Sequence, residues 1–351
     1  MKFNLKTYFQ DIHYSRVKAG ALLKMCLYAA EFFYGKAVSL KNLLYKKNIL
    51  KEKNVDAYVI CVGNLTTGGV GKTPITISLA NKYSEEKKVA VVSRGYGSKL
   101  DTKNPQIIKD LEGIKFQNGT LCGDEPFEIA RKTEKNISVI ICKDRYKACK
   151  LAIEKYNSEI IIMDDGFSNR KVKKDKTILV FDSEMKFGNG HMLPAGPLRE
   201  DKKEIARCDE IYLVNKGNDD IENSINEFKQ YSKKISICNM KPKRIYNALT
   251  NAEVKTNTEE KTRAIAFCAI GQPVQFFDFL KNYYDIISYV FSDHHKYTAG
   301  DINSLIKLAN KNHTSTLITT QKDETKIKKL ITNCVGYSFN ILELENEIKE
   351  I

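Results

Sequence analysis

The 351-residue sequence contains no tryptophan, only seven prolines, and nine cysteines that follow no recognisable spacing. The number of cysteines is odd and no Cys-x-x-Cys pair occurs. Several cysteines lie inside apolar runs, where this residue acts as a small buried hydrophobe. The sequence therefore predicts neither a disulfide framework nor a zinc site, and it indicates a reducing cytosol.

Long uncharged runs are also missing from the apolar-rich N-terminal segment, residues 15–47. Its longest stretch without a charge is the six residues Met25 to Ala30, whereas a helix that crosses a bilayer needs about twenty. The opening residues, 1–6, lack the apolar core and cleavage site of a signal peptide. We therefore predict no membrane-spanning segment and no signal peptide here.

Residues 1–50 are instead expected to contain a basic amphipathic helix, because apolar residues recur at helical spacing among lysines and arginines. Such a helix can lie on an anionic membrane surface, or it can pack on the core of the protein. The periodicity alone leaves both alternatives open. The apolar face comprises Leu22, Leu23, Met25, Cys26, Leu27, Ala29, Ala30, Phe32 and Phe33.

The formal net charge is +14, from 57 basic and 43 acidic residues. A basic surface can meet nucleic acid, an anionic membrane or a phosphorylated substrate, although a composition rich in Lys, Ile and Asn can also arise from coding bias. No dense block of Lys and Arg is present. Because aromatic residues are not interleaved with the basic ones and no nucleic-acid-binding motif occurs, we predict no nucleic-acid partner.

The rest of the chain is organised around residues 56–74. Residues 58–62 form a short β-branched run, typical of a buried strand. Residues 63–71 hold four glycines and cannot continue that strand, and a helical pattern follows Pro74. This order predicts a phosphate-binding P-loop, in which backbone N–H groups and a helix N-terminus face an anion.

The predicted nucleotide-binding residues are Gly68, Gly69, Val70, Gly71, Lys72, Thr73 and Pro74. The Lys72 ammonium is expected to reach the β- and γ-phosphates, and the Thr73 hydroxyl is expected to bind Mg²⁺. The match is incomplete at one position, because the usual pattern has a glycine where this chain has Thr66.

Apolar runs and helical patterns alternate along residues 51–235, which predicts a mainly parallel sheet with helices on both faces. The run Ile160–Met163 ends in Asp164 and Asp165, as in Walker-B sequences whose carboxylate holds Mg²⁺. An acidic turn is the alternative. The other strands after the P-loop are expected at 88–93, 139–142, 178–182 and 211–216.

Further charged residues follow the predicted strands. Arg94 lies in a turn after the strand at 88–93, Asp124 opens a helix, and Arg145 follows the strand at 139–142. Ligands of such sheets bind at the carboxyl ends of the strands, so these residues, the P-loop and Asp164 predict one active site. The Gly- and Pro-rich loop at 188–200 is elaborate enough to be functional.

Residues 217–262 are polar and weakly periodic, and we interpret 236–262 as an extended connector. It would join a P-loop core, 51–235, to a smaller α/β lobe, 263–351. In that lobe Asp293 and His294 lie in a loop with His295, where they indicate a catalytic relay, a metal site or an ordinary polar loop.

Six segments in order resemble the tetraacyldisaccharide 4′-kinase family of lipid A biosynthesis, from the N-terminal helix to about residue 325. The block at 193–200 is the most specific of them. The segments are 62–74, Ser93-Arg94-Gly95-Tyr96-Gly97, Gly123-Asp124-Glu125-Pro126, Asp164-Asp165-Gly166-Phe167, Leu193-Pro194-Ala195-Gly196-Pro197-Leu198-Arg199-Glu200 and Asp293-His294-His295.

The resemblance implies a P-loop NTPase-like kinase, peripheral on the cytoplasmic face of a Gram-negative inner membrane. It would transfer the γ-phosphate of ATP to the 4′-hydroxyl of a tetraacylated glucosamine disaccharide 1-phosphate, with Mg²⁺, to give lipid IVA. The implied partners are the lipid-linked disaccharide and the anionic membrane surface. Because this substrate stays in the bilayer, the resemblance favours membrane binding by the N-terminal helix.

The resemblance also implies roles for residues. Asp124 would accept the hydroxyl proton and His294 would orient Asp124, in a dyad that assembles when the lobes close; Lys72 is the third expected catalytic residue. Thr73, Asp164 and Asp165 are the expected ligands of Mg²⁺. The residues expected to bind substrate, including its phosphate charge, are Asn64, Arg94, Tyr96, Arg145 and Arg199.

Two positions depart from the family pattern. Ser168-Asn169 stands where the family usually has Gln-His, and Gln321 stands where it usually has Glu.

Two other functions are alternatives to this kinase. A partitioning ATPase would need a lysine before the Gly-Gly pair, where this chain has Thr67. A kinase of a soluble sugar or nucleoside is the other alternative, and the N-terminal helix argues against it.

Overall fold

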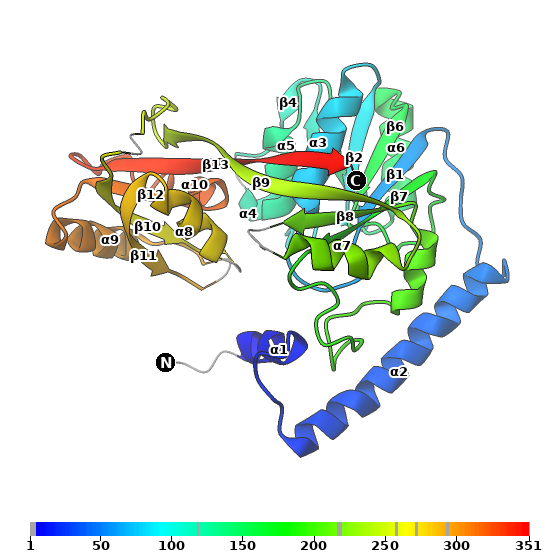
Figure 1. Cartoon of the computed structure of the whole chain (residues 1–351). Helices are drawn as coiled ribbons and strands as arrows, with labels where there is room; N and C mark the ends of the chain where they lie inside the picture. The colour runs from blue at the N-terminus through cyan, green and yellow to red at the C-terminus, as the bar shows by residue number, and fades with distance from the viewer. Residues whose placement is uncertain are drawn as a thin grey trace. The chain divides into compact units, whose positions relative to one another are not determined.

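The computed structural model describes residues 5–350 except Asn118 and the ranges 216–219, 257–258, 271–272 and 293–294. The chain divides into two compact units (Figure 1). The first comprises residues 1–239 with 348–351, and the second comprises residues 240–347. Each unit is described by itself below.

The first unit is built on a mainly parallel sheet in which the strands are ordered β9-β8-β7-β1-β6-β2-β5-β3-β4. From β9 to β5 the pairing is parallel throughout. These strands are β1 Tyr58–Gly63, β2 Val89–Ser93, β5 Ser138–Ile141, β6 Ile160–Asp164, β7 Lys176–Asp182, β8 Glu210–Asn215 and β9 Lys234–Asn247.

Helices cover both faces of this sheet because both sets of alternating strand residues are apolar. One face packs Val59, Ala90 and Ile161 against Ala148 and Ala152 of α6, Arg145–Tyr156. Helices α3, Lys72–Ser84, and α5, Asp124–Lys132, pack against the sheet and against each other. The parallel register pairs Val62 with Asp164, so the strand before the P-loop and the Walker-B strand end level.

Another cluster of apolar side chains packs against β7 and β8. Phe181 of β7 packs on Phe187 and on Phe228, with ring centroids 5.2 and 4.6 Å apart. Phe228 belongs to α7, Ile221–Lys229, whose N-cap Asp220 accepts a hydrogen bond from the backbone of Asn223. This cluster anchors the segment 187–199, which covers most of the Gly- and Pro-rich loop predicted at 188–200. Phe187, the first residue of the segment, and Leu198 near its end both belong to the cluster.

The sequence prediction missed several short elements of the first unit. No strand was predicted between the strands at 88–93 and 139–142, but this stretch contains β3 Gln106–Asp110, β4 Gly113–Ile114 and the short helix α4 Gly119–Cys122. Strand β3 is antiparallel to β5 and forms a hairpin with β4 at the sheet edge. The sequence pattern of β3 does not look like that of a buried strand, because one of its buried residues is the charged Lys109. Its Nζ donates to Thr133 O at 2.6 Å and to Glu134 O at 2.7 Å.

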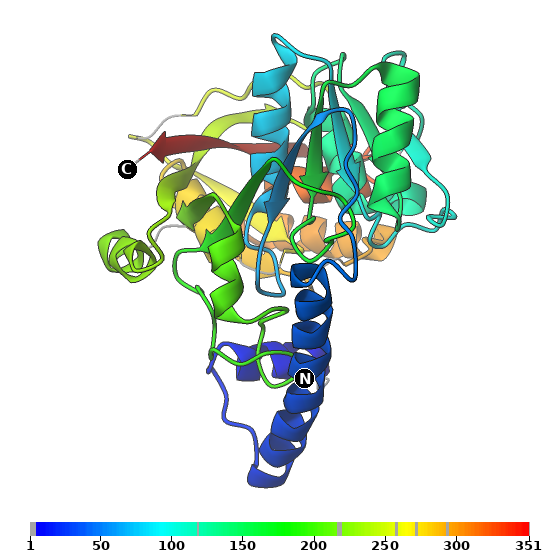
Figure 2. The same ribbon diagram turned by 90° about the vertical axis from the view of Figure 1, so that its right-hand side faces the viewer.

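The N-terminal region contains two helices, α1 Leu5–His13 and α2 Ala21–Lys46. Figure 2 shows α2 as the long blue helix beside the green loop that follows β7. Over the residues that the structure describes, no helix is both long and apolar enough to cross a membrane.

In the second unit the strands are ordered β11-β10-β12-β13, and each neighbouring pair is parallel. Alternate residues of β10, Thr262–Cys268, pack against Leu305 of α9, Ala299–Lys311, and against Phe276 of α8, Val274–Lys281. The remaining elements are β11 Tyr284–Val290, β12 Thr316–Thr320, α10 Gln321–Ile327 and β13 Ser338–Glu350. Strand β13 was not predicted.

The prediction of a mixed α/β protein with a large, mainly parallel sheet and an N-terminal helix is confirmed. Strand β9 occupies much of the segment interpreted as a connector, and α7 lies within the region described as weakly periodic. The four-part division at 1–50, 51–235, 236–262 and 263–351 stays a prediction, since compactness alone defines the two units.

Candidate functional site

The predicted P-loop joins β1 to α3 in the strand–loop–helix order expected. A Cβ on Gly63 would lie 2.6 Å from Phe167 Cβ, so only glycine lets β1 end this close to the loop after β6. Gly71, with φ at 92°, occupies the left-handed region directly before α3 begins at Lys72. The glycines thus turn the chain so that Lys72 and Thr73 open the helix.

Asp164, the last residue of β6, is buried. Its Oδ1 accepts a hydrogen bond from Thr76 Oγ1 of α3 at 3.0 Å. Burial raises the pKa of Asp164 to about 7, and the nearby carboxylates of Glu125 and Asp165 act in the same direction against the charge of Lys72. In the metal-free protein the ionised form is therefore poorly compensated.

Asp165 has the opposite electrostatic environment. Its φ of 49° is unusual for a residue other than glycine. Arg199 donates two hydrogen bonds to its carboxylate, at 2.8 and 3.0 Å, and Lys72 Nζ lies 3.8 Å away. Burial opposes ionisation, but the Lys72 charge and the bonds from Arg199 hold the pKa of Asp165 well below its usual range.

Arg199 connects the 187–199 loop to the P-loop. Its guanidinium also donates to the backbone oxygen of Asn64 at 3.2 Å and to the Asn64 side-chain oxygen, and its backbone N–H donates to Leu65 O at 2.7 Å. Lys72, Asp165, Arg199 and Asn64 therefore form one continuous cluster. Four residues predicted for different roles are brought together in it.

Arg145 is buried beside this cluster. Its NH1 donates to Cys142 O at 2.9 Å, whereas its buried Nε has no hydrogen-bond partner among the residues that the structure describes. Burial lowers the pKa of Arg145, while the carboxylates of Asp165 and Asp164 favour its charged form and Arg94 opposes it. A buried, incompletely bonded guanidinium is an unusual and costly arrangement unless an anion completes it.

Asp124 is the first residue of α5 and is half-buried. The preceding Gly123 lies against the Arg94–Ser98 turn, since a Cβ there would be 2.8 Å from Tyr96 O. Tyr96 itself is 84% exposed. The predicted dyad partner His294 and its neighbour Asp293 lie outside the described residues, and the neighbouring His295 bonds to Asp301 Oδ2 at 3.1 Å.

Helices α1 and α2, together with Tyr14 directly after α1, contact the P-loop and the 187–199 loop. The Tyr14 hydroxyl donates to Thr67 O at 2.9 Å, and the His13 ring lies 2.9 Å from Pro194 O. Glu31 accepts a bond from the backbone of Met192 at 2.6 Å and pairs with the His191 ring. We name these contacts the N-terminal brace; the sequence offered no signal for them.

Two residues near the cluster escaped the sequence analysis. Thr76 follows Lys72 by four positions, so it lies on the same face of α3, and this spacing was a signal that could have identified it. Glu125 acts on Asp164 through its charge. It was assigned no role because an acidic residue in the first turn of a helix is usually only a capping or dipole contact.

Mg²⁺ in a kinase needs one or two carboxylates and completes its shell with water and phosphate oxygens. Asp164 fits this requirement, because it is a buried carboxylate whose negative charge lacks full compensation. Asp165 fits less well, since Arg199 engages both of its oxygens. Within the described ranges no three His, Cys, Asp or Glu side chains gather in a group that could hold a metal.

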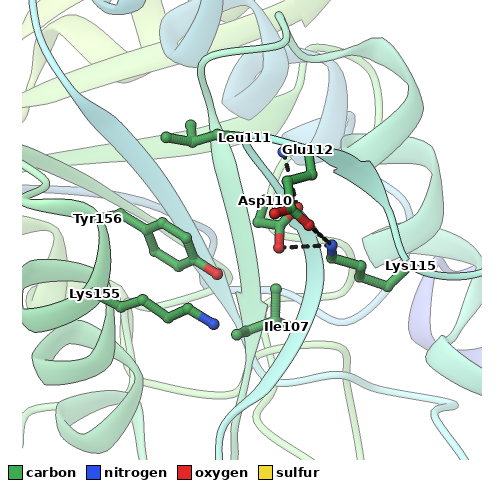
Figure 3. A pocket seen from close by; sticks show the side chains of 7 residues that line it. All are labelled: Ile107, Asp110, Leu111, Glu112, Lys115, Lys155 and Tyr156. Carbon is green, nitrogen blue, oxygen red and sulfur yellow. Dashed lines mark hydrogen bonds and ion pairs between the residues drawn. The ribbon is translucent and has the colours of Figure 1, made fainter.

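Two of the hollows on the first unit differ in their position relative to the predicted site residues. The larger, about 520 Å³, lies by the β3–β4 hairpin, where Lys115 pairs with Asp110 at 2.8 Å (Figure 3). It is at the amino-end edge of the parallel strands and contains none of the predicted residues. The smaller, about 420 Å³, includes Arg94 and Tyr96 and lies at the carboxyl ends of β2 and β5.

The chain is similar to known proteins over most of its length. The profile of the family described as LpxK, Tetraacyldisaccharide-1-P 4'-kinase, matches residues 23–350. A Tetraacyldisaccharide 4'-kinase from Halothermothrix orenii is 32% identical, over 91% of this chain and 87% of the relative. Another, from Francisella tularensis subsp. tularensis, is 32% identical, over 83% of this chain and 87% of the relative.

A solved structure is similar as well. The crystal structure of LpxK from Aquifex aeolicus in complex with ATP matches with a TM-score of 0.71 and 29% identity, over 93% of this chain and 95% of that one. These matches favour the kinase over the partitioning-ATPase, nucleic-acid-binding and soluble-sugar alternatives. The chain therefore belongs to the tetraacyldisaccharide 4′-kinase family, ATP-dependent kinases that phosphorylate the 4′ position of tetraacyldisaccharide 1-phosphate in lipid A biosynthesis.

Proposed function

We propose that this chain transfers the γ-phosphate of ATP to the 4′-hydroxyl of the lipid-linked disaccharide 1-phosphate, giving lipid IVA. The observation that carries the proposal is the joint placement of Lys72, at the start of α3, and Asp164, at the end of the adjacent β6. A family member crystallised with ATP matches most of the chain, which supports ATP as the phosphoryl donor.

The nucleotide phosphates are bound by the N-terminus of α3 and by the loop Gly68–Pro74. Backbone N–H groups there face the anion, and Lys72, held near the cluster by Asp165, contacts the β- and γ-phosphates. Arg145 binds phosphate charge as well. The unsatisfied Nε of its buried guanidinium supports that role.

Asp164 and the Thr73 hydroxyl would hold Mg²⁺. The bound ion would neutralise charge on the phosphates during transfer. Asp165 was predicted as a third ligand; because it is bonded to Arg199 and close to Lys72, we assign it instead to positioning these two cations.

Asp124 accepts the proton of the 4′-hydroxyl, and His294 orients Asp124 and tunes its pKa. The half-buried position of Asp124 at the start of α5, next to the Arg94–Tyr96 turn, supports its role. Arg94, Tyr96 and Arg199 contact the sugar-phosphate substrate. Asn64 was predicted to do so as well; because it is fully buried and bonded to Arg199, we assign it instead to positioning Arg199.

The protein binds peripherally to the cytoplasmic face of the inner membrane through α2. Several large apolar side chains of this helix are exposed although the opposite face packs inward through Leu27. Burying such side chains in a bilayer surface is favourable, and the surrounding lysines favour anionic lipid. The exposed side chains are Leu22, Met25, Phe32, Phe33, Leu40 and Leu43.

The test is transfer of ³²P from ATP to the purified disaccharide 1-phosphate in detergent, with and without Mg²⁺. We expect a labelled lipid only with Mg²⁺. Lys72→Ala and Asp124→Ala should each lower turnover at least about 100-fold, since each removes a group that acts in the transition state. Both variants should keep the circular dichroism of the wild type.

Two results would contradict the proposal. Near-normal turnover in either variant would remove the mechanism. ATP hydrolysis without labelled lipid would leave a working P-loop with a different acceptor.

A further inference from the structure

We infer that the smaller pocket, between the Arg94–Lys103 segment and Lys143, binds the 1-phosphate of the acceptor disaccharide. The inference rests on the proposed function and extends it to the far end of the substrate. It assigns Lys103 and Lys143 as the residues that bind this phosphate. Neither lysine belongs to a motif described above.

The first argument is unpaired positive charge. Arg94, Lys103 and Lys143 line one hollow of about 420 Å³. Among the described residues none of these three cations forms an ion pair, whereas many other lysines of the chain do. Three cations around one hollow repel each other, and an anion bound there would relieve that repulsion.

The only acidic residue in the lining is already engaged. Asp101 Oδ1 accepts the backbone N–H of Lys103 at 3.0 Å, and its Oδ2 accepts from the Asn104 side chain at 3.2 Å. Asp101 thus shapes the turn that carries Lys103 instead of neutralising the lysines. Ser98, Thr102 and Tyr96 also line the hollow, but the Ser98 hydroxyl already donates to Leu121 O at 3.0 Å, so the charge of the three cations is what would hold an anion there.

The second argument is position. The backbone N–H of Lys143 donates to Thr102 O at 2.8 Å, and that of Cys142 donates to Ser93 O at 3.0 Å. The pocket therefore lies past the carboxyl ends of β2 and β5, on the same edge as the P-loop. Strand order β1-β6-β2-β5 places it one to two strands beyond Asp164, roughly 5–10 Å along the edge at about 4.8 Å per strand.

This offset matches the chemistry of the substrate. Phosphoryl transfer occurs at the 4′ position of one sugar, while the existing phosphate is on position 1 of the other sugar. Gly123, next to the proposed base Asp124, contacts the Tyr96–Ser98 turn that forms one wall of the pocket. A disaccharide whose 4′-hydroxyl faces Asp124 can therefore extend over this turn with its 1-phosphate in the pocket.

The experiment compares two acceptors, the disaccharide 1-phosphate and the same disaccharide without its 1-phosphate, in mixed micelles. The variants are Lys103→Gln, Lys143→Gln and both together. Lys147→Gln is the matched control. Lys147 is an exposed lysine of α6, four residues after Lys143, and it does not line the pocket. Each pocket variant should raise KM for the 1-phosphate about fivefold, the size expected for one partly exposed charge contact.

The same variants should leave KM for the dephosphorylated acceptor and for ATP unchanged, and the difference between the acceptors should shrink at high salt. An equal rise for both acceptors, a rise in KM for ATP, or no change would overturn the inference. Failure of the proposed function is distinct, since the wild type would then label neither acceptor. In that case binding of the two acceptors, measured without turnover by microscale thermophoresis, still tests the pocket.

Discussion

The pKa values of two adjacent carboxylates, Asp164 and Asp165, are shifted in opposite directions. Asp164 is buried with one neutral donor, Thr76, so its pKa rises to about 7. Asp165 is also desolvated, but Lys72 and Arg199 hold its pKa low. Asp164 is therefore suited to bind a cation, whereas Asp165 is already paired with Lys72 and Arg199. The sequence, in which both are Asp after an apolar strand, contained no signal for this difference.

This contrast predicts how stability depends on pH. The pKa of Asp164 lies near 7 in the folded protein and at 3.8 when unperturbed, so the folded state binds more protons between these values. Stability of the metal-free wild type then falls as pH rises through this window. Asp164→Asn, which carries no charge, should become more stable than the wild type by about 2–4 kcal/mol at pH 8, while losing Mg²⁺-dependent transfer.

Thermal unfolding without Mg²⁺ at pH 5 and pH 8 measures this effect. Asp165→Asn is the matched control and should behave in the opposite way. The lowered pKa of Asp165 contributes stability above pH 4 that is lost as the pH falls, so its replacement should destabilise the protein at pH 8. A stability advantage of Asp164→Asn that does not grow with pH would contradict this account.

Helix α2 has one face that packs against the protein and one that is exposed. Its inner face packs Leu27 inward, donates from Lys41 to Ser168 O, and carries Glu31 of the N-terminal brace. Its outer face exposes Leu22 by 73% and Phe33 by 72%. The two alternatives left open by the helical periodicity, core packing and a membrane surface, therefore need not exclude each other: the first describes the inner face, and the second is our proposal for the outer face.

The outer face predicts a separable membrane function. Leu22→Glu and Phe33→Glu should each weaken binding to anionic vesicles at least about tenfold, because each removes a large apolar side chain and adds a repelled charge. ATP binding should not change. Ala30→Glu is the matched control, because it adds the same charge at an exposed position of α2 without removing a large side chain.

Sedimentation with vesicles measures this binding, and unchanged sedimentation of both variants would contradict the membrane proposal. Deletion of residues 1–35 would be a poorer test. It would also remove the bonds from Tyr14 to Thr67 and from Glu31 to Met192, and so disturb the P-loop region.

How far the elements could be predicted depended on the range of the interactions that form them. The P-loop, the strand ending in Asp164 and the helix opened by Asp124 were predicted because glycine, β-branched and capping preferences act locally. Strand β3, with its buried Lys109, and strand β13 depend on partners distant in sequence. The cluster of Asn64, Asp165 and Arg199 was predicted residue by residue, but not as one bonded unit.

At the scale of the whole molecule, the proposed mechanism combines residues from both units, Asp124 from the first and His294 from the second. If they act as one functional pair, the effects of Asp124→Ala and His294→Ala on turnover should not add. The double variant should be about as slow as the slower single variant.

Single-turnover ³²P transfer by the four proteins of this cycle measures the coupling. His295→Ala is the control, since His295 bonds to Asp301 within its own unit, and it should stay within about threefold of the wild type, as expected of a residue outside the chemical step. Fully multiplicative losses would mean that Asp124 and His294 act independently, and the dyad would be ruled out.

The N-terminal brace also has a consequence for the order in which the chain is made. Its bonds join residues 161 and 181 positions apart, Glu31 to Met192 and His13 to Pro194. At about 5–20 residues per second, a ribosome completes α2 roughly 8–30 s before it makes the loop that α2 braces. During this interval an apolar, basic helix is displayed on a nascent chain that has no kinase fold yet. We expect the bilayer surface to be its first partner, so that synthesis itself delivers the protein to its lipid.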